Sequence, residues 1–279
     1  MVKTALRMSR WTLMAWMMSA LLLASSAQAA VNVSVAGNQA TAQIEVGGLE
    51  TELILSFDGS DNLSAEALNI SAQLVSLTDP ALLSRLPNAL LTSVPAAMPL
   101  LITVEPPSGT GFALYNTVRV EVHTHLLPYT AGSHFRLFKA PLGGSFSDIT
   151  DEIAPGSVRA RGTTGGFSQF LVLVDLRTTD SVISSKLSAL QQRCQAAPTS
   201  LRGALLARLN QVQVTLALRR YGDALAALDQ FRADVSANAG SQLGNQWTPS
   251  QRSGNVAGDL LSGAASLKFS IAYRRDWGN

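Results

Sequence analysis

The chain is poor in cysteine, aromatic residues and charge. Its 279 residues include one cysteine, Cys194, and only 6% of them are aromatic. A single cysteine excludes an internal disulfide, so stability has to come from packing. Charged residues make up 14% of the chain, with 21 basic against 19 acidic side chains. This balance lacks the basic excess typical of nucleic-acid-binding proteins, and we expect no nucleic-acid partner.

The chain also lacks an apolar run long enough for a membrane-spanning helix. The longest run, residues 11–23, is shorter than the about 20 residues that span a bilayer. Three basic residues precede it: Lys3, Arg7 and Arg10. Ala27-Gln28-Ala29 follows, with the small residues that signal peptidase accepts. We predict a signal peptide over residues 1–29, with an uncleaved anchor as the alternative. We therefore expect an exported protein, periplasmic or extracellular, without a membrane span after cleavage.

Residues 30–177 have the pattern of an antiparallel β domain. Val31, Val33 and Val35 alternate with polar residues, and Gly37-Asn38 and Gly47-Gly48 suit the two-residue turns of tight hairpins. Further strands are expected at 67–77, 100–104, 117–125, 134–139, 157–161 and 167–175. Roughly nine short strands separated by turns favour an Ig-like two-sheet sandwich over a closed barrel.

Residues 180–279 change to a helical period. Leu201, Leu205 and Leu209 recur at four-residue spacing, and Thr248-Pro249 is a typical start for a last helix. We predict a bundle of three to four helices. The fold class is therefore α+β with segregated parts, an N-terminal sandwich domain followed by a C-terminal helical domain.

The helical part resembles a known module. From Leu205 to Tyr273 it has a Leu-rich helix, the turn Tyr221-Gly222-Asp223, a second helix, and a third segment containing GDLLSGAASL. This order is similar to FIMAH, a helical module at the C-terminal ends of secreted bacterial proteins. The resemblance implies an accessory domain without known chemistry. The β part, through VEPPSGTGFALYNTVRVEVHTHLLPYTAGSHFRLFKAPLGGSFSDIT, is similar to a domain of uncharacterised secreted bacterial proteins, which implies no activity.

The three histidines are the candidate metal ligands. His123 and His125 form an H-x-H pair on one face of an expected strand, a spacing that presents two imidazoles to one metal ion. If residues 126–133 form a hairpin loop, His134 approaches from the neighbouring strand, with Glu121 as a possible carboxylate ligand. The alternative is that these are ordinary polar residues on a solvent-facing sheet.

Two arginines suggest a ligand patch. Arg159 and Arg161 share one face of a strand, and with Lys139 and Arg136 they are candidates for binding an anionic glycan. Tyr129 is a candidate aromatic contact at the end of the sandwich. Charges at this density are also routine on a solvated sheet, which is the alternative interpretation.

The sequence contains no complete catalytic set. The segment Gly166-Phe167-Ser168-Gln169-Phe170 lacks the second glycine of a nucleophile elbow. Cys194 lies on an apolar helix stripe, where we expect a buried, inert thiol. We therefore predict a non-enzymatic accessory or recognition protein, without a cofactor, that binds a protein or glycan partner. Two alternatives stay open: a metal-dependent function of the histidines, and an assembly or scaffold role of the helical domain.

Overall fold

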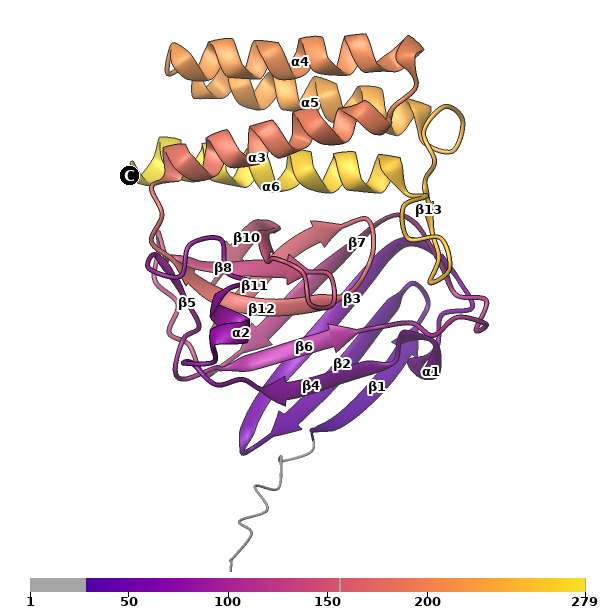
Figure 1. Ribbon diagram of the computed structural model, residues 1–279, viewed down its shortest axis with the longest axis vertical. Coiled ribbons are helices and arrows are strands. Elements are labelled where there is room, and N and C mark those ends of the chain that lie inside the picture. Colours follow the sequence, from indigo (N-terminus) through magenta and orange to yellow (C-terminus); the bar gives the residue numbers. More distant parts are fainter. Residues whose placement is uncertain (1–28, 156, 279) are drawn as a thin grey trace, which may run out of the picture.

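The computed structural model describes residues 29–155 and 157–278 (Figure 1). The predicted signal peptide lies outside these residues, apart from Ala29. None of the described helices combines the length and the apolar character that crossing a membrane requires.

The N-terminal part consists of two antiparallel sheets, and the C-terminal part of helices, as predicted. The seven-stranded sheet has the order β1 (Ala30–Ala36), β2 (Gln39–Val46), β3 (Leu49–Asp61), β7 (Ala113–Thr124), β11 (Val158–Thr164) and β10 (Thr150–Ala154), with β13 (Gln246–Trp247) paired to β7. The six-stranded sheet has the order β4 (Ile70–Leu74), β6 (Leu100–Val104), β12 (Gln169–Asp175), β8 (Phe135–Ala140) and β9 (Ser147–Asp148), with β5 (Thr92–Ser93) paired to β12.

The core of the sandwich follows from the alternating pattern. Val118, Val120 and Val122 of β7 are buried against the facing sheet, and the residues between them face outward. Each buried valine contributes about 1.5–3 kcal/mol. In β12, residues 170–173 are all buried. One side of this strand faces the sandwich core and the other packs with Leu82 of α2 (Pro80–Leu83), which explains its apolar composition.

The strand predicted at 67–77 is shorter than expected. Its first residues belong to a helical turn, α1 (Ala65–Leu68), and β4 begins only at Ile70. The Ser64 hydroxyl accepts a hydrogen bond of 3.1 Å from the backbone of Ala67 and caps this turn. Asn69 then reverses the chain in a left-handed conformation, with a φ of 46°. Local capping at Ser64 therefore overrides the strand pattern.

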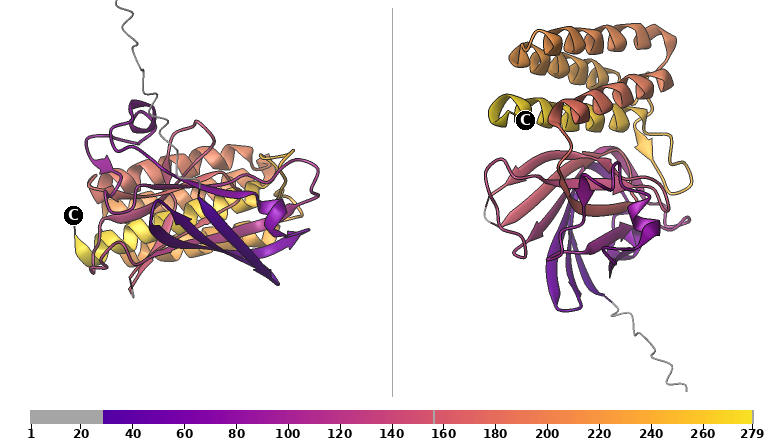
Figure 2. Two further views of the ribbon diagram at one scale, coloured as in Figure 1. Left: turned by 90° about the horizontal axis from the view of Figure 1, so that it is seen from below. Right: turned by 60° about the vertical axis from the view of Figure 1, so that its left-hand side comes forward.

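Four helices form two layers above the sandwich, namely α3 (Thr179–Arg193), α4 (Thr199–Ala217), α5 (Tyr221–Asn238) and α6 (Val256–Trp277). In Figures 1 and 2, α3 and α6 lie next to the sheets, and α4 and α5 form the outer layer. Their apolar stripes meet in one core that includes Leu205, Phe231 and Leu267. Cys194 is buried there, as predicted, and burial raises the pKa of its thiol to about 11, so the reactive thiolate is scarce at neutral pH.

The prediction that Thr248-Pro249 starts the last helix is wrong. Helix α6 begins at Val256, where the side chain of Asn255 accepts a hydrogen bond of 2.9 Å from Gly258. The preceding segment returns to the sandwich, and Trp247 of β13 pairs with Leu114 of β7. Trp247 is only 3% exposed and belongs to the sandwich core. A residue from the expected helical domain thus completes the core of the expected β domain.

The backbone of helix α6 lies close to the backbone of the sandwich at Gly258. A β-carbon at Gly258 would lie 2.1 Å from the carbonyl oxygen of Asn116, so only glycine fits there. Eight residues further along the same face, the Ser266 hydroxyl donates a hydrogen bond of 3.0 Å to the carbonyl of Asp148. At these positions the interface is therefore held by close backbone packing and by a hydrogen bond between the two parts.

A lysine with a partly buried side chain lies at this interface. The ammonium of Lys139 donates hydrogen bonds of 2.6 Å to the Thr164 hydroxyl and to the carbonyl of Gly166. Burial lowers its pKa from 10.5 to about 8, although Asp259 opposes this shift. Between pH 10.5 and about 8, Lys139 is protonated in the unfolded chain but has largely lost its proton in the native protein. The contribution of Lys139 to the free energy of unfolding should therefore rise with pH in this range.

We expect a Lys139→Met variant to lack this rise, which is at most about 1.4 kcal/mol per pH unit. The measurement is urea unfolding of both proteins at several pH values between about 8 and about 10. Lys268→Met is the matched control, because Lys268 forms an ion pair with Asp229 on the helical layer. Parallel pH profiles of the wild type and Lys139→Met would contradict the prediction.

Candidate functional site

His123, Arg159 and Arg161 lie on the outer face of the seven-stranded sheet, where Arg159 is opposite His123. The Nδ1 atom of His123 lies 3.3 Å from a carboxylate oxygen of Glu52, and its Nε2 atom lies 2.9 Å from the Ser157 hydroxyl. The ring centroids of His123 and His125 are 4.9 Å apart. The predicted H-x-H pair is thus formed, but both ring nitrogens of His123 already have protein partners.

His134 does not join this pair. It directly precedes β8, which belongs to the six-stranded sheet and pairs with β12 and β9. Residues 126–133 carry the chain from one sheet to the other, so the hairpin loop on which the approach of His134 depended is not formed. In residues 29–155 and 157–278, no three His, Cys, Asp or Glu side chains come together as a set able to hold a metal ion.

The arginine patch is neutralised by a carboxylate. Arg159 and Arg161 hold the two oxygens of Glu121 at 2.6 and 2.5 Å. Burial alone raises the pKa of Glu121, but the two arginines outweigh it and hold the pKa below its usual value. Lys139 and Arg136, expected nearby, belong to β8 in the other sheet. The basic patch of four side chains is therefore not formed.

Tyr129 is partly buried and packs against the sandwich core. It therefore offers less surface to a ligand than the sequence suggests. Ligand binding by Tyr129, Arg159 and Arg161 stays a prediction, and the sandwich face that carries the arginines presents charges already paired with one another.

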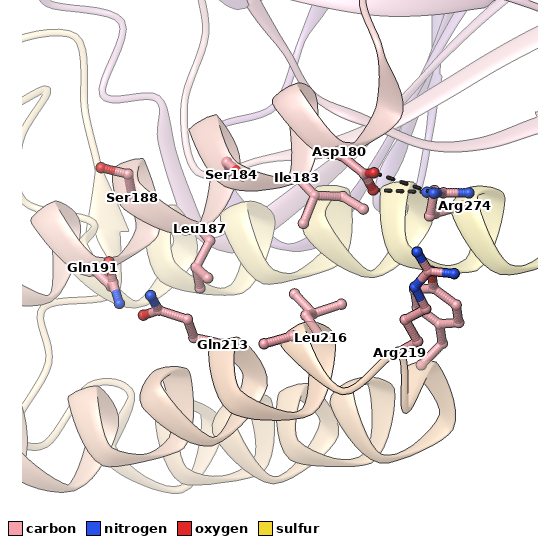
Figure 3. Close-up of a pocket in the computed structure, with 12 residues that line it drawn as sticks. Asp180, Ile183, Ser184, Leu187, Ser188, Gln191, Gln213, Leu216, Arg219 and Arg274 are labelled. Atoms are coloured by element: carbon pink, nitrogen blue, oxygen red, sulfur yellow. Dashed lines mark hydrogen bonds and ion pairs between the residues drawn. The ribbon is translucent and has the colours of Figure 1, made fainter. Parts of the chain in front are cut away.

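A larger concave site lies in the helical part, between α3 and α4 (Figure 3). Helix α4 packs along α5, α5 along α6, and α6 along α3, whereas α3 and α4 touch little. This open side of the bundle leaves a groove of about 430 Å³, which we call the α3–α4 groove. Its lining residues are Asp180, Ile183, Ser184, Leu187, Ser188, Gln191, Gln213, Leu216, Ala217, Arg219, Tyr221 and Arg274.

One end of the groove is charged. Arg274 of α6 binds Asp180 of α3 with a distance of 2.7 Å between guanidinium and carboxylate. In Figure 3, Arg219 extends from the end of α4 toward Arg274. The guanidinium of Arg219 has no hydrogen-bond or ion-pair partner among the residues that the structure describes. Arg274 is thus paired with Asp180 whereas Arg219 is not, so this end carries a net positive charge.

The backbone of Arg219 is strained. Helix α4 ends in a Schellman motif, in which Arg219 N–H donates to Leu216 O at 2.9 Å and Arg220 N–H to Thr215 O at 2.8 Å. The motif places Arg219 in the left-handed region, with a φ of 56°. Glycine is the favoured residue there, and other residues cost on the order of 1 kcal/mol. The sequence retains an arginine where glycine would be more stable.

Away from its charged end, the groove has an apolar floor and polar side chains along its walls. Ile183 and Leu187 of α3 are buried, and Leu216 faces them from α4. At the far end, the amide groups of Gln191 and Gln213 point toward one another across the groove (Figure 3). The groove therefore offers a cationic end, an apolar floor and an amide end. Sequence periodicity identifies only the floor, because the groove depends on how the helices diverge.

In a comparison with protein-family models, a match covers residues 14–275. Its description is a family of unknown function, DUF6689. The chain belongs to this family. The match extends across the sheets and the helices, in agreement with the prediction of an uncharacterised family. No curated protein and no solved structure matches the chain. The resemblance of the helices to FIMAH has no support in these comparisons and stays a prediction.

Proposed function

We propose that the protein is an exported, non-enzymatic recognition protein, and that its α3–α4 groove binds a short peptide segment of a partner protein. The observation that carries this proposal is Arg219, an unpaired guanidinium on a strained backbone at the rim of the α3–α4 groove. Strain of this kind is typically retained where a side chain has a function. The resemblance to FIMAH and the signal-peptide pattern support an accessory role outside the cytoplasm.

The chemistry of the groove favours a peptide over a glycan. An apolar floor formed by Ile183, Leu187 and Leu216 suits an aliphatic side chain. The amides of Gln191 and Gln213 match the donors and acceptors of a peptide backbone. Glycans stack on aromatic rings, and Tyr221 is the one aromatic residue in the lining. The cationic end at Arg219 selects a carboxylate.

The proposal is tested by NMR titration of the ¹⁵N-labelled protein with N-acetylated tripeptides that contain leucine and end in a free carboxylate. We expect chemical-shift changes at Ser184, Ser188 and Gln213, and at least tenfold weaker binding of the same peptides with an amidated C-terminus. Shifts confined to residues outside the groove, or equal binding of the amidated peptides, would contradict the proposal. Maltotriose serves as the glycan probe. Tighter binding of maltotriose than of the peptides would mean that the groove binds a sugar rather than a peptide.

The variant Arg219→Gly is expected to change peptide binding and stability in opposite directions. Glycine relieves the left-handed strain, so we expect the free energy of unfolding to rise by about 1 kcal/mol while peptide binding weakens at least tenfold. Urea unfolding and the same titration measure the two effects. Arg232→Ala is the matched control, because Arg232 is an exposed arginine of α5 outside the groove. We expect this variant to bind like the wild type.

Export has its own test. The intact mass of the protein recovered from the periplasm or medium is expected to correspond to cleavage after Ala29. Retention of the full chain in the cytoplasm would contradict the exported part of the proposal and leave the groove chemistry unaffected.

A further inference from the structure

Among the residues that the structure describes, strand β1 is the edge of the seven-stranded sheet and pairs with β2 alone. The two strands are joined by a two-residue turn, Gly37-Asn38, in which Gly37 has a φ of 57°. In such a hairpin the flanking residues, Ala36 and Gln39, exchange both backbone hydrogen bonds, and hydrogen-bonded pairs then recur at every second residue. The N–H and C=O groups of Val31, Val33 and Val35 therefore point away from β2.

This edge lacks the devices that normally block strand pairing. Residues 30–36 contain no charged residue and no proline, and their register with β2 is continuous, without a bulge. Val35 is 36% exposed, and Val31 and Val33 are only partly buried. Unpaired backbone groups and incompletely buried valines thus occupy the same edge.

We propose that β1 is an interface between two copies of this chain, which pair their β1 strands antiparallel about a twofold axis at Val33. In this register Val33 lies opposite Val33 of the second copy, and Val31 lies opposite Val35. Every outward-facing N–H and C=O group of these three residues then finds a partner. The valines of both copies continue the apolar face of one sheet, because a strand places alternate residues on the same side.

The charges near β1 permit this arrangement. The nearest carboxylate on β2 is Glu45, which lies opposite Ala30. Antiparallel pairing places Ala30 of one copy beside Ala36 of the other, so the two Glu45 side chains lie at opposite ends of the interface. On the solvent side, Asn32 faces Ser34 of the second copy. A single strand pair buries less than the about 1,200 Å² of a stable complex, so the dimer is expected to be concentration-dependent.

The test is sedimentation equilibrium of the exported protein from about 1 µM to about 1 mM, with two variants that differ only in charge pattern. Asn32→Lys/Ser34→Lys places like charges opposite each other, and we expect at least tenfold weaker dimerisation. Asn32→Lys/Ser34→Glu places opposite charges in the same positions, and we expect dimerisation as strong as in the wild type or stronger. Both residues are exposed, so folding is maintained.

Two outcomes would overturn the proposal. One is a wild-type protein that stays monomeric over the whole range. The other is a dimer whose strength is the same in both variants, which would place the interface elsewhere or assign a different register.

Discussion

Replacing Trp247 with alanine is expected to lower the free energy of unfolding by about 3–5 kcal/mol. The indole lies 5.7 Å from the ring of Phe167 and 6.4 Å from that of Phe112, measured between centroids. Its removal leaves a cavity in the sandwich core, where the neighbouring rings are held by rigid strands. The loss also weakens the attachment of β13 to β7, because Trp247 is the residue of β13 that packs in the sandwich core.

Urea unfolding followed by circular dichroism measures this effect. Trp277→Ala is the matched control, because Trp277 is 54% exposed at the end of α6, and we expect it to cost less than about 1 kcal/mol. A loss of similar size in the two variants would contradict a core position for Trp247. A second check is Gly166→Ala, since a β-carbon at Gly166 would lie 2.5 Å from the Trp247 ring. Gly166→Ala should destabilise the wild type more than it destabilises Trp247→Ala.

The segregated fold could be predicted from the sequence because local periodicity reflects burial. The alternating pattern of β2 and of Val118, Val120 and Val122 requires one face in a core, and the four-residue spacing of Leu201, Leu205 and Leu209 requires a helix with an apolar side. These requirements act within a few residues. They are therefore visible without knowledge of the rest of the molecule.

The wrong predictions at Thr248-Pro249 and at His134 concern long-range contacts. The two residues of β13 form a strand by pairing with β7, and Trp247 packs against Gly166, both of which are far away in the sequence. His134 was expected beside His123 because the two are close in sequence, yet a change of sheet separates them. The α3–α4 groove has no sequence pattern of its own. Its one local sign is Arg219, an arginine at a helix end where glycine is favoured, followed at once by Arg220 and the next helix.

Breaking the buried ion pair between Asp148 and Lys186 should have an effect as large as the loss of Trp247. Their charged atoms are 2.6 Å apart, and the side chains are 2% and 11% exposed, respectively. Asp148 also accepts a hydrogen bond of 2.8 Å from the backbone of Thr150, and Lys186 donates one of 2.9 Å to the Ser270 hydroxyl. The pair joins β9 to α3 and α6, and we expect Lys186→Met to cost about 3–5 kcal/mol.

The pH dependence of this cost follows from the carboxylate. In the wild type, burial alone raises the pKa of Asp148, but Lys186 and Arg136 outweigh it and hold the pKa below 3.8. The pair therefore stabilises the wild type above this value, and the stabilisation is lost as the pH falls through the lower native pKa. In Lys186→Met the lysine no longer offsets the burial of Asp148, so we expect the native state to favour the ionised carboxylate less than in the wild type. The difference in the free energy of unfolding between the wild type and Lys186→Met should be largest near neutral pH and become smaller below about pH 4.

A double-mutant cycle decides whether the pair acts as a unit. Asp148→Leu/Lys186→Met removes both charges, and we expect it to be more stable than either single variant, because no uncompensated charge is left buried. Helix α3 carries Lys186 on the side of the sandwich and Ser184 and Asp180 in the α3–α4 groove. The double variant should therefore also retain peptide binding in the titration. Equal instability of the double and single variants would mean that the position of α3, and with it the groove, depends on hydrogen bonds such as that of Ser270 rather than on the ion pair.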